Sequence, residues 1–448
     1  MVGLGGAHAR AIGSAGNVRI PHDFVLKEFP IEVKRFVGRR WGEAEVQDEL
    51  RWCPFKATEA PDGGLLLDLS CGKDGESLGE MHCFTPEQLL AMHFVNLRCS
   101  VEMDTDTSPA SECVISVPCW YTDAQRRAFL TAADQAGLQT IRLLSETAAA
   151  ALSWGFPRSL ELPNDLARPR HVLFFDMGHA SVQVCIVAFN KSKLSVVASA
   201  FDRNLGGRDF DRAVLEHFAE EWKTKSDVDL HPTDSDPQVQ RLLSEIEWAR
   251  QQLSNGSACT KPLSIKVQQF LDGRYFASTL DARKFATIVE PLIKRALEPV
   301  KQVLSDAKLS AHQLDEVEMV GGATRSPLMV KALRELLGRH ARRSVNSEEA
   351  VSLGCALSAA MSSRSFPGRR MAVSDCVSFP ISLAWTGGPL LACRSHAGAT
   401  QGSDAPGPRA PGAVGAIGAI SDAGRSGGHL SGLASGAHRG PEDLRRRV

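Results

Sequence analysis

The stretch FFDMGHASVQVCIV, residues 174–187, decides the fold of this chain. An apolar run ends on Asp176, a glycine follows at position 178, and a second apolar run begins at position 182. This pattern predicts a hairpin of two buried strands that brings a carboxylate to a tight turn. Backbone N–H groups in such a turn can bind a phosphate, and the carboxylate can hold Mg²⁺ through water. An ordinary hairpin that happens to end on an acid is the other interpretation.

Composition narrows the class of protein. The chain has 448 residues, of which 43% are hydrophobic, and a formal net charge of −1. That is enough apolar material for two or three domains, and the charge does not favour nucleic acid or a membrane as a partner. The 11 cysteines form no C-x-x-C pair, which indicates a reduced intracellular protein. We therefore expect a cytoplasmic location, shared with the nucleus, rather than import into an organelle.

Strand and helix patterns alternate along the chain, which predicts an α/β fold with two lobes. Residues 113–121 have the pattern of a strand, and residues 122–137 that of a helix that begins with a capping box of Thr122 and Gln125. Asn346 is expected to cap a later helix, and Pro291 and Pro299 to kink or break another. Further strands are expected at 140–146, 171–178, 182–189, 193–202 and 314–322, and helices at 147–155, 238–254, 281–308 and 346–361.

Three features follow the hairpin in order. Gly206 and Gly207 come after the third strand, and Gly321 and Gly322 lie between a strand and a helix. Between them, the helix at 238–254 places Glu247, Arg250 and Ser254 at i, i+3 and i+7, and therefore on one face. A solvated face is the commoner interpretation of such a helix by itself. The acid–glycine turn, the two glycine pairs and this helix face, taken in this order, carry more information than any one of them alone.

This order resembles the actin-like ATPase fold, and specifically the nucleotide-binding domain of the 70-kilodalton heat-shock chaperones. Thr147 after Glu146, the turn sequence DMGHAS and the stretch FPISLAW (379–385) are similar to the 110-kilodalton subfamily, in its plant or algal form. The resemblance implies an α/β, ribonuclease H-like, two-lobed ATPase domain. The stretches that carry it are VKRFVGRRW (33–41), VISVPCWYTDAQRRA (114–128), IRLLSETAAAALSWG (141–155), LGGRDFD (205–211), MVGGATRSP (319–327) and NSEEAVSLGCALSAA (346–360).

The resemblance also implies a division of the chain and a set of site residues. Lys34 would reach the terminal phosphates, Asp176 would organise Mg²⁺ and water, and Glu146 is the third catalytic candidate. The expected segments are an unmatched 1–10, lobe I at 11–165, lobe II at 166–349, a returning helix at 350–368, a linker and first strand of a further domain at 369–386, and a disordered Gly/Ala/Ser-rich tail at 387–448. The residues expected to bind the cofactors, ATP and Mg²⁺, are Gly178, His179, Ser181, Gly206, Gly207, Glu247, Arg250, Ser254, Gly321, Gly322, Ala323 and Arg325.

The chain departs from the family at both ends. The family opens with an acid–glycine hairpin in lobe I that closes on the phosphates, and no D-x-G hairpin occurs here before residue 50. We therefore expect the first strands of lobe I to be missing, and the strand at 113–118 to have an unpaired edge. Gln183 also stands where the main branch has an acid, so ATP hydrolysis is left open. Because the resemblance stops near residue 386, we expect a chain that is truncated at both ends and has no peptide-binding domain.

The resemblance implies an ATP-binding chaperone-family protein. In its full-length form it would act as a nucleotide exchange factor and holdase for 70-kilodalton chaperones, contacting the partner chaperone through lobe II residues of about 206–290. Unfolded clients would bind only the full-length form. The alternatives are a degenerate interaction module that binds no nucleotide, or a truncated gene product. A small-molecule kinase of the same superfamily is a third, less favoured, because no separate substrate-domain signature is present.

Overall fold

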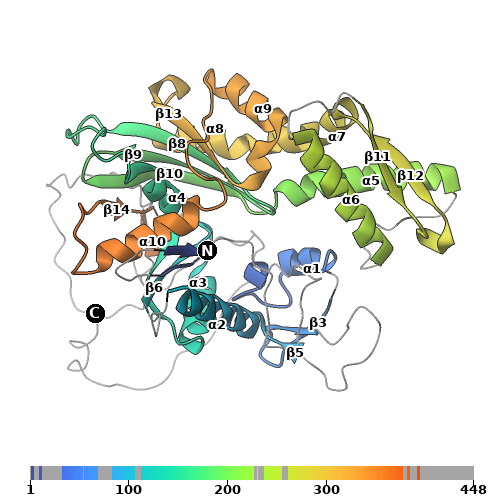
Figure 1. The fold of residues 1–448 in the computed structure, drawn as a ribbon, viewed down its shortest axis with the longest axis horizontal. Coiled ribbons are helices and arrows are strands. Elements are labelled where there is room, and N and C mark those ends of the chain that lie inside the picture. The colour runs from blue at the N-terminus through green and yellow to red at the C-terminus, as the bar shows by residue number, and fades with distance from the viewer. Residues whose placement is uncertain are drawn as a thin grey trace.

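The structure, a computed structural model, describes residues 2–4, 10–12, 33–53, 55–68, 83–105, 112–226, 230, 237–254, 261–376, 381–383 and 391–393. These residues form a mixed α/β fold with two larger sheets, which confirms the predicted fold class. Figure 1 shows one sheet with α2, α3 and α1 in the lower part of the view, and the other sheet with α5 to α9 in the upper part. We call these parts the β6 half and the β8 half.

The sheet of the β8 half contains the predicted hairpin. It has the order β13-β8-β9-β10-β14, and β8 and β9 are antiparallel with Asp176 opposite Gln183. The strand β13 pairs with β8 in parallel, so that Val320 lies opposite Asp176. The C-terminal ends of β8 and β13, just before Gly178 and Gly321, therefore lie side by side. The strands are β8 (Arg170–Met177), β9 (Val182–Phe189), β10 (Lys193–Asp202), β13 (Glu316–Val320) and β14 (Ala372–Ser374).

The sheet of the β6 half has the order β2-β1-β6-β7. Here the expectation of an unpaired edge beside residues 113–118 is wrong, because β1 pairs antiparallel with β6 and places Val2 opposite Ile115. The edge is thus paired within the chain at residues 113–115. The strands are β1 (Val2–Leu4), β2 (Arg10–Ile12), β6 (Glu112–Val117) and β7 (Gln139–Ser145).

The bounds of the helices agree with some of the predicted caps and breaks and differ from others. The capping box of Thr122 and Gln125 is present at the start of α3 (Asp123–Gln135), as predicted. The helix α10 (Ala350–Ser362), however, begins four residues after Asn346, because the oxygens of Asn346 accept the amides of a preceding turn. The predicted break occurs before Pro299, between α7 (Ala282–Ala296) and α8 (Glu298–Ala307), whereas Pro291 lies inside α7.

The remaining elements complete the two halves. Among the described residues, no helix combines the length and the apolar character that crossing a membrane requires. The strand β16 lies within the tail predicted to be disordered, so that prediction is wrong for its three residues, and the rest of 387–448 lies outside the described residues. The elements are η1 (Val33–Arg35), α1 (Ala44–Leu50), β3 (Lys56–Glu59), β4 (Leu65–Asp68), β5 (Cys83–Phe84), α2 (Pro86–Thr105), α4 (Glu146–Gly155), α5 (Gly207–Ser226), α6 (Pro237–Ser254), β11 (Leu263–Val267), η2 (Leu271–Gly273), β12 (Phe276–Leu280), η3 (Ala311–Gln313), η4 (Gly322–Arg325), α9 (Pro327–Leu337), β15 (Ile381–Leu383) and β16 (Leu391–Cys393).

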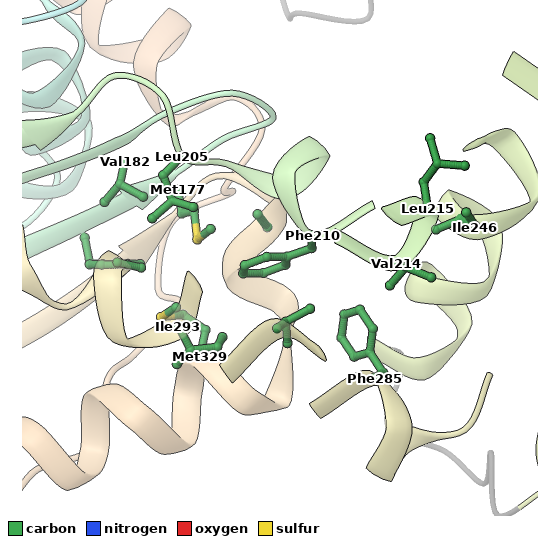
Figure 2. Close-up of a cluster of buried hydrophobic side chains, with 14 of the residues drawn as sticks. Met177, Val182, Leu205, Phe210, Val214, Leu215, Ile246, Phe285, Ile293 and Met329 are labelled. Carbon is green, nitrogen blue, oxygen red and sulfur yellow. The ribbon is translucent and has the colours of Figure 1, made fainter. Parts of the chain in front are cut away.

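Apolar clusters hold the hairpin and the two sheets in place. Met177 and Val182, which flank the turn, are fully buried with Phe210 of α5 in the main cluster of the β8 half, as Figure 2 shows. A second cluster joins the two halves, because it contains Val114 and Leu144 of the β6 sheet together with residues of β8, β9, α4 and α10. We call this second cluster the floor. Burial of this apolar surface fixes the positions from which the site residues project.

Candidate functional site

The turn after β8 is held by backbone hydrogen bonds and by close backbone contacts that involve three glycines. Within the turn, the amide of Gly178 donates to the carbonyl of Ser181 at 3.0 Å. From the start of α5, the amide of Gly207 donates to the carbonyl of Gly178 at 3.0 Å. A Cβ at Gly206 would lie 2.3 Å from the carbonyl oxygen of His179, so only glycine allows this approach. Gly206 therefore packs behind the turn.

The second glycine pair comes close to the same carboxylate. Gly321 has a φ of 86°, and a Cβ there would lie 2.6 Å from Oδ1 of Asp176. Because Gly321 has no side chain, the start of η4 can lie directly against the end of β8. By contrast, a Cβ at Gly178 or Gly322 would meet no atom within 4 Å. These two glycines border open space, where their backbone is accessible to a ligand.

A cavity of about 680 Å³ opens between these turns, and it gathers the residues that the sequence singled out. Every predicted site residue except Gly206 lines it, including Lys34 from η1 and Glu247 from α6. The sequence positions of these residues range from 34 to 325, so the fold brings together segments that are far apart in the chain. The structure shows where these residues lie, and their roles remain predictions.

The carboxylates at the deep end of the cavity are held by a short chain of contacts. Nζ of Lys34 lies 3.7 Å from Oε1 of Glu146. The side-chain amide of Gln183 donates to Oε2 of Glu146 and accepts the amide N–H of Cys119 at 3.1 Å. Burial, with the charge of Glu146 added, raises the pKa of Asp176 to about 7, against the opposing effect of Lys34. A cation bound here would favour the ionised form of Asp176.

The other end of the cavity has two arginines, each held by a carboxylate. Nε and Nη2 of Arg250 donate to the two oxygens of Asp211, at 2.6 and 3.1 Å. Burial raises the pKa of Asp211 to about 6 even though Arg250 opposes this. Across the cavity, Nη2 of Arg325 donates to Glu348 at 2.6 Å. The bidentate contact fixes the plane of the Arg250 guanidinium, which is suited to stacking on a flat ring.

Several cavity residues were not predicted. Arg35 and Arg39 line the cavity and follow Lys34 within VKRFVGRRW, so their closeness to Lys34 was the available signal. Gln251 also lines it, and its amide donates to Glu247 at 3.3 Å. The hydroxyl of Tyr121 donates to the carbonyl of Lys34, which ties η1 to the end of β6. Only the three-dimensional contact reveals that role for Tyr121.

Comparison with known proteins identifies the family. Residues 8–397 match the family model described as "Hsp70 protein". The chain belongs to the Hsp70 family. The predicted similarity to its large subfamily is confirmed by the relatives described next.

The curated relatives include large heat-shock proteins. The chain is 35% identical over 356 residues to the 97 kDa heat shock protein of Strongylocentrotus purpuratus, covering 80% of this chain and 39% of the relative. It is 36% identical over 383 residues to heat shock 70 kDa protein 14 of Arabidopsis thaliana, covering 85% and 44%. It is 33% identical over 382 residues to heat shock protein 110 of Caenorhabditis elegans, covering 85% and 47%. The chain thus spans less than half the length of these relatives.

Proposed function

We propose that the cleft of this heat-shock chaperone-family chain binds ATP together with Mg²⁺. One observation carries the proposal: Lys34, Asp176, Glu247 and Gly321, from four distant segments, line a single cavity. Its volume of about 680 Å³ is within the usual range for small-molecule sites. This convergence favours nucleotide binding over an interaction module without a nucleotide.

The deep end of the cleft fits phosphates and a magnesium ion. The open backbone at Gly178 and Gly322 offers amides to phosphate oxygens, and Lys34 offers a point charge. Among the described residues, no three metal-binding side chains gather closely enough to hold a metal without help. Mg²⁺ usually keeps several waters and binds one or two carboxylates plus substrate phosphates, which one carboxylate such as Asp176 allows. When bound, the ion would neutralise phosphate charge, while Gln183 keeps the Glu146 carboxylate in place.

The outer end fits a purine nucleoside. The guanidinium of Arg250, held in one plane by Asp211, and that of Arg325, held by Glu348, offer flat cationic surfaces for the base. Glu247 and Ser254 lie along the same helix and line the cavity, where they can accept or donate hydrogen bonds to the ribose.

For the whole protein we propose a role as nucleotide exchange factor and holdase for 70-kilodalton chaperones in the cytoplasm and nucleus. The similarity to a protein named heat shock protein 110 supports this part of the proposal. The surface of about residues 206–290, which includes α5, α6 and the β11–β12 hairpin, would contact the partner chaperone. The test is the release of labelled ADP from such a chaperone by the full-length protein, which should be faster than spontaneous release. Unchanged release would contradict the exchange role.

Nucleotide binding is tested by calorimetric titration with Mg-ATP and by thermal unfolding. A ligand at about a thousandfold over its Kd stabilises the folded state by roughly 4 kcal/mol, so binding should raise the melting temperature measurably. Asp176→Asn should weaken binding by at least about tenfold, because it removes a charge-assisted contact. Asp306→Asn, in α8 and outside the cavity, is the matched control. Absence of binding heat and of stabilisation in the unmodified protein would contradict the proposal and favour the interaction module.

A further inference from the structure

The two halves also meet away from the floor, through one short helix. The helix α1 packs with the β6 half, because its Val46 belongs to an apolar cluster with Leu67 and Leu89. Its acidic residues, however, contact arginines of the loop and helix that follow β10 in the β8 half. These contacts lie beside the cleft rather than beneath it.

The central contact is a buried carboxylate between two arginines. Glu49 is 8% exposed, and its Oε2 accepts Nη2 of Arg208 at 2.8 Å while Oε1 accepts the other terminal nitrogen. Nη2 of Arg35 lies 3.2 Å from the same carboxylate. Burial alone would raise the pKa of Glu49, but the arginines outweigh it and lower that pKa. The carboxylate is therefore ionised and bound from both halves.

Two more contacts join α1 and the residues that follow it to the β8 half. Glu45 accepts hydrogen bonds from Arg203 of the β8 half and from Arg39 of its own half. The guanidinium of Arg212 lies 4.1 Å from the ring centroid of Trp52. Glu45 and Glu49 are spaced i, i+4 on α1, as Arg208 and Arg212 are on α5, so each set lies on one helix face. We call Glu45, Glu49 and Trp52, together with Arg203, Arg208 and Arg212, the α1 clamp.

The α1 clamp is connected to the wall of the cleft. Arg35, Arg39 and Arg203 line the cavity, whereas Glu45 and Glu49, which bind them, do not. Arg35 also bridges to the β8 half by donating to Oδ1 of Asn204 at 2.7 Å. Any motion that separates the halves at this side of the cleft must therefore break the contacts of both glutamates.

The chemistry of the α1 clamp differs from that of the floor. The floor is an interdigitated apolar cluster, and such a contact loses its stabilisation in proportion to the area exposed to water. The charged groups of the clamp can exchange their partners for water and counterions when they separate. We propose that the α1 clamp is a releasable lock, and that its opening widens the cleft while the floor stays packed.

The proposal is tested by hydrogen–deuterium exchange of the full chain without nucleotide, so it does not depend on the proposed function. Glu49→Gln should speed amide exchange in residues 44–53 and 203–212 by about thirtyfold, the factor expected for the loss of a charged hydrogen bond. Exchange in the floor helices α4 and α10 should stay slower than in the clamp segments, and its acceleration should not exceed what the loss of global stability requires. Arg170→Gln, which removes an ion pair with Glu316 inside the β8 half, is the matched control and should leave both clamp segments unchanged.

A second variant separates release of the lock from general loss of stability. If Glu49 and Arg208 act as a pair, Glu49→Gln combined with Arg208→Gln should speed exchange no more than the stronger single change does. Raising the salt concentration should speed exchange in the clamp segments only modestly, because the buried pair of Glu49 and Arg208 is screened less than an exposed pair is. Exchange in the floor as fast as in the clamp segments, additive effects of the two changes, or no acceleration in the clamp segments would each overturn the proposal.

Discussion

The two halves of the molecule meet at several places, among them the ring contact of Trp120 with Phe201, and the floor and the α1 clamp are two of these contacts made of different residues. In the floor, α10 and α4 approach so closely that a Cβ at Gly354 would lie 1.9 Å from the carbonyl oxygen of Ala149. In the α1 clamp, two carboxylates and an indole ring contact three arginines. The floor depends on shape and apolar area, whereas the clamp combines charged contacts with one apolar contact, that of Trp52 with the core of the β8 half. In the proposal made above, the clamp is the contact that opens when the cleft widens, while the floor stays packed.

The largest expected effect lies in the floor. Trp154 is fully buried, with its ring centroid 5.0 Å from that of Phe189 and 6.1 Å from that of Phe174. Trp154→Ala should lower the free energy of unfolding by about 4 kcal/mol, because it leaves a large cavity. Denaturant unfolding measures this change. Trp248→Ala, at a half-exposed position on α6, is the control and should cost less than about 1 kcal/mol. Similar costs for the two variants would contradict the role given to the floor.

The clamp should have an intermediate effect on stability. Glu49→Gln removes the charge between Arg35 and Arg208, and should lower the free energy of unfolding by about 2 kcal/mol, as for hydrogen bonds to charged groups. The same denaturant titration measures it, with Lys294→Gln, which removes an exposed ion pair with Glu290, as control. A loss as large as that of Trp154→Ala would mean that the clamp is part of the core rather than a releasable contact.

The charge cluster around Glu221, which lies within the β8 half, should have the smallest effect on stability. That effect should depend on pH. Burial would raise the pKa of Glu221, but hydrogen bonds from Lys225, Ser278 and Lys284 lower it to about 2. Stability from Glu221 is therefore fully present above its usual pKa of about 4.5 and is lost as pH falls towards 2. Glu221→Gln should flatten the fall of the melting temperature between pH 5 and pH 3 by a contribution below about 1 kcal/mol. An unchanged acid profile would contradict the assigned contacts.

The central hairpin and the gathering of the site could be predicted from the sequence. Apolar runs before Asp176 and from position 182 predict the two strands, and the order of the glycine pairs after them carries the resemblance to the family. The parallel pairing of β13 with β8 then brings Gly321 to Asp176. The strands follow from the pattern of apolar residues. The turns follow from glycines, because only glycine allows the backbone geometry found there.

Other features could not be predicted, because they depend on contacts between distant segments. Asp211 fixes Arg250 from a position 39 residues away in the sequence, and no local pattern indicates the partner. The same holds for Glu49 and Arg208. The strand β1 has only three residues, too few for any periodicity to show, so its pairing with β6 was missed. The late start of α10 follows from a turn that uses the oxygens of Asn346 before the helix begins.

Hydrogen–deuterium exchange of the unmodified chain with and without Mg-ATP tests the central claim most directly. The claim is that the turn at 176–181, the polar face of α6 at 247–254 and the segment 321–325 form one nucleotide site. We predict that Mg-ATP slows exchange in all three segments together, and that at the same Mg-ATP concentration the protection of all three is reduced together when Asp176 is changed to Asn. Protection of one segment alone, or of residues outside the cleft only, would contradict the account.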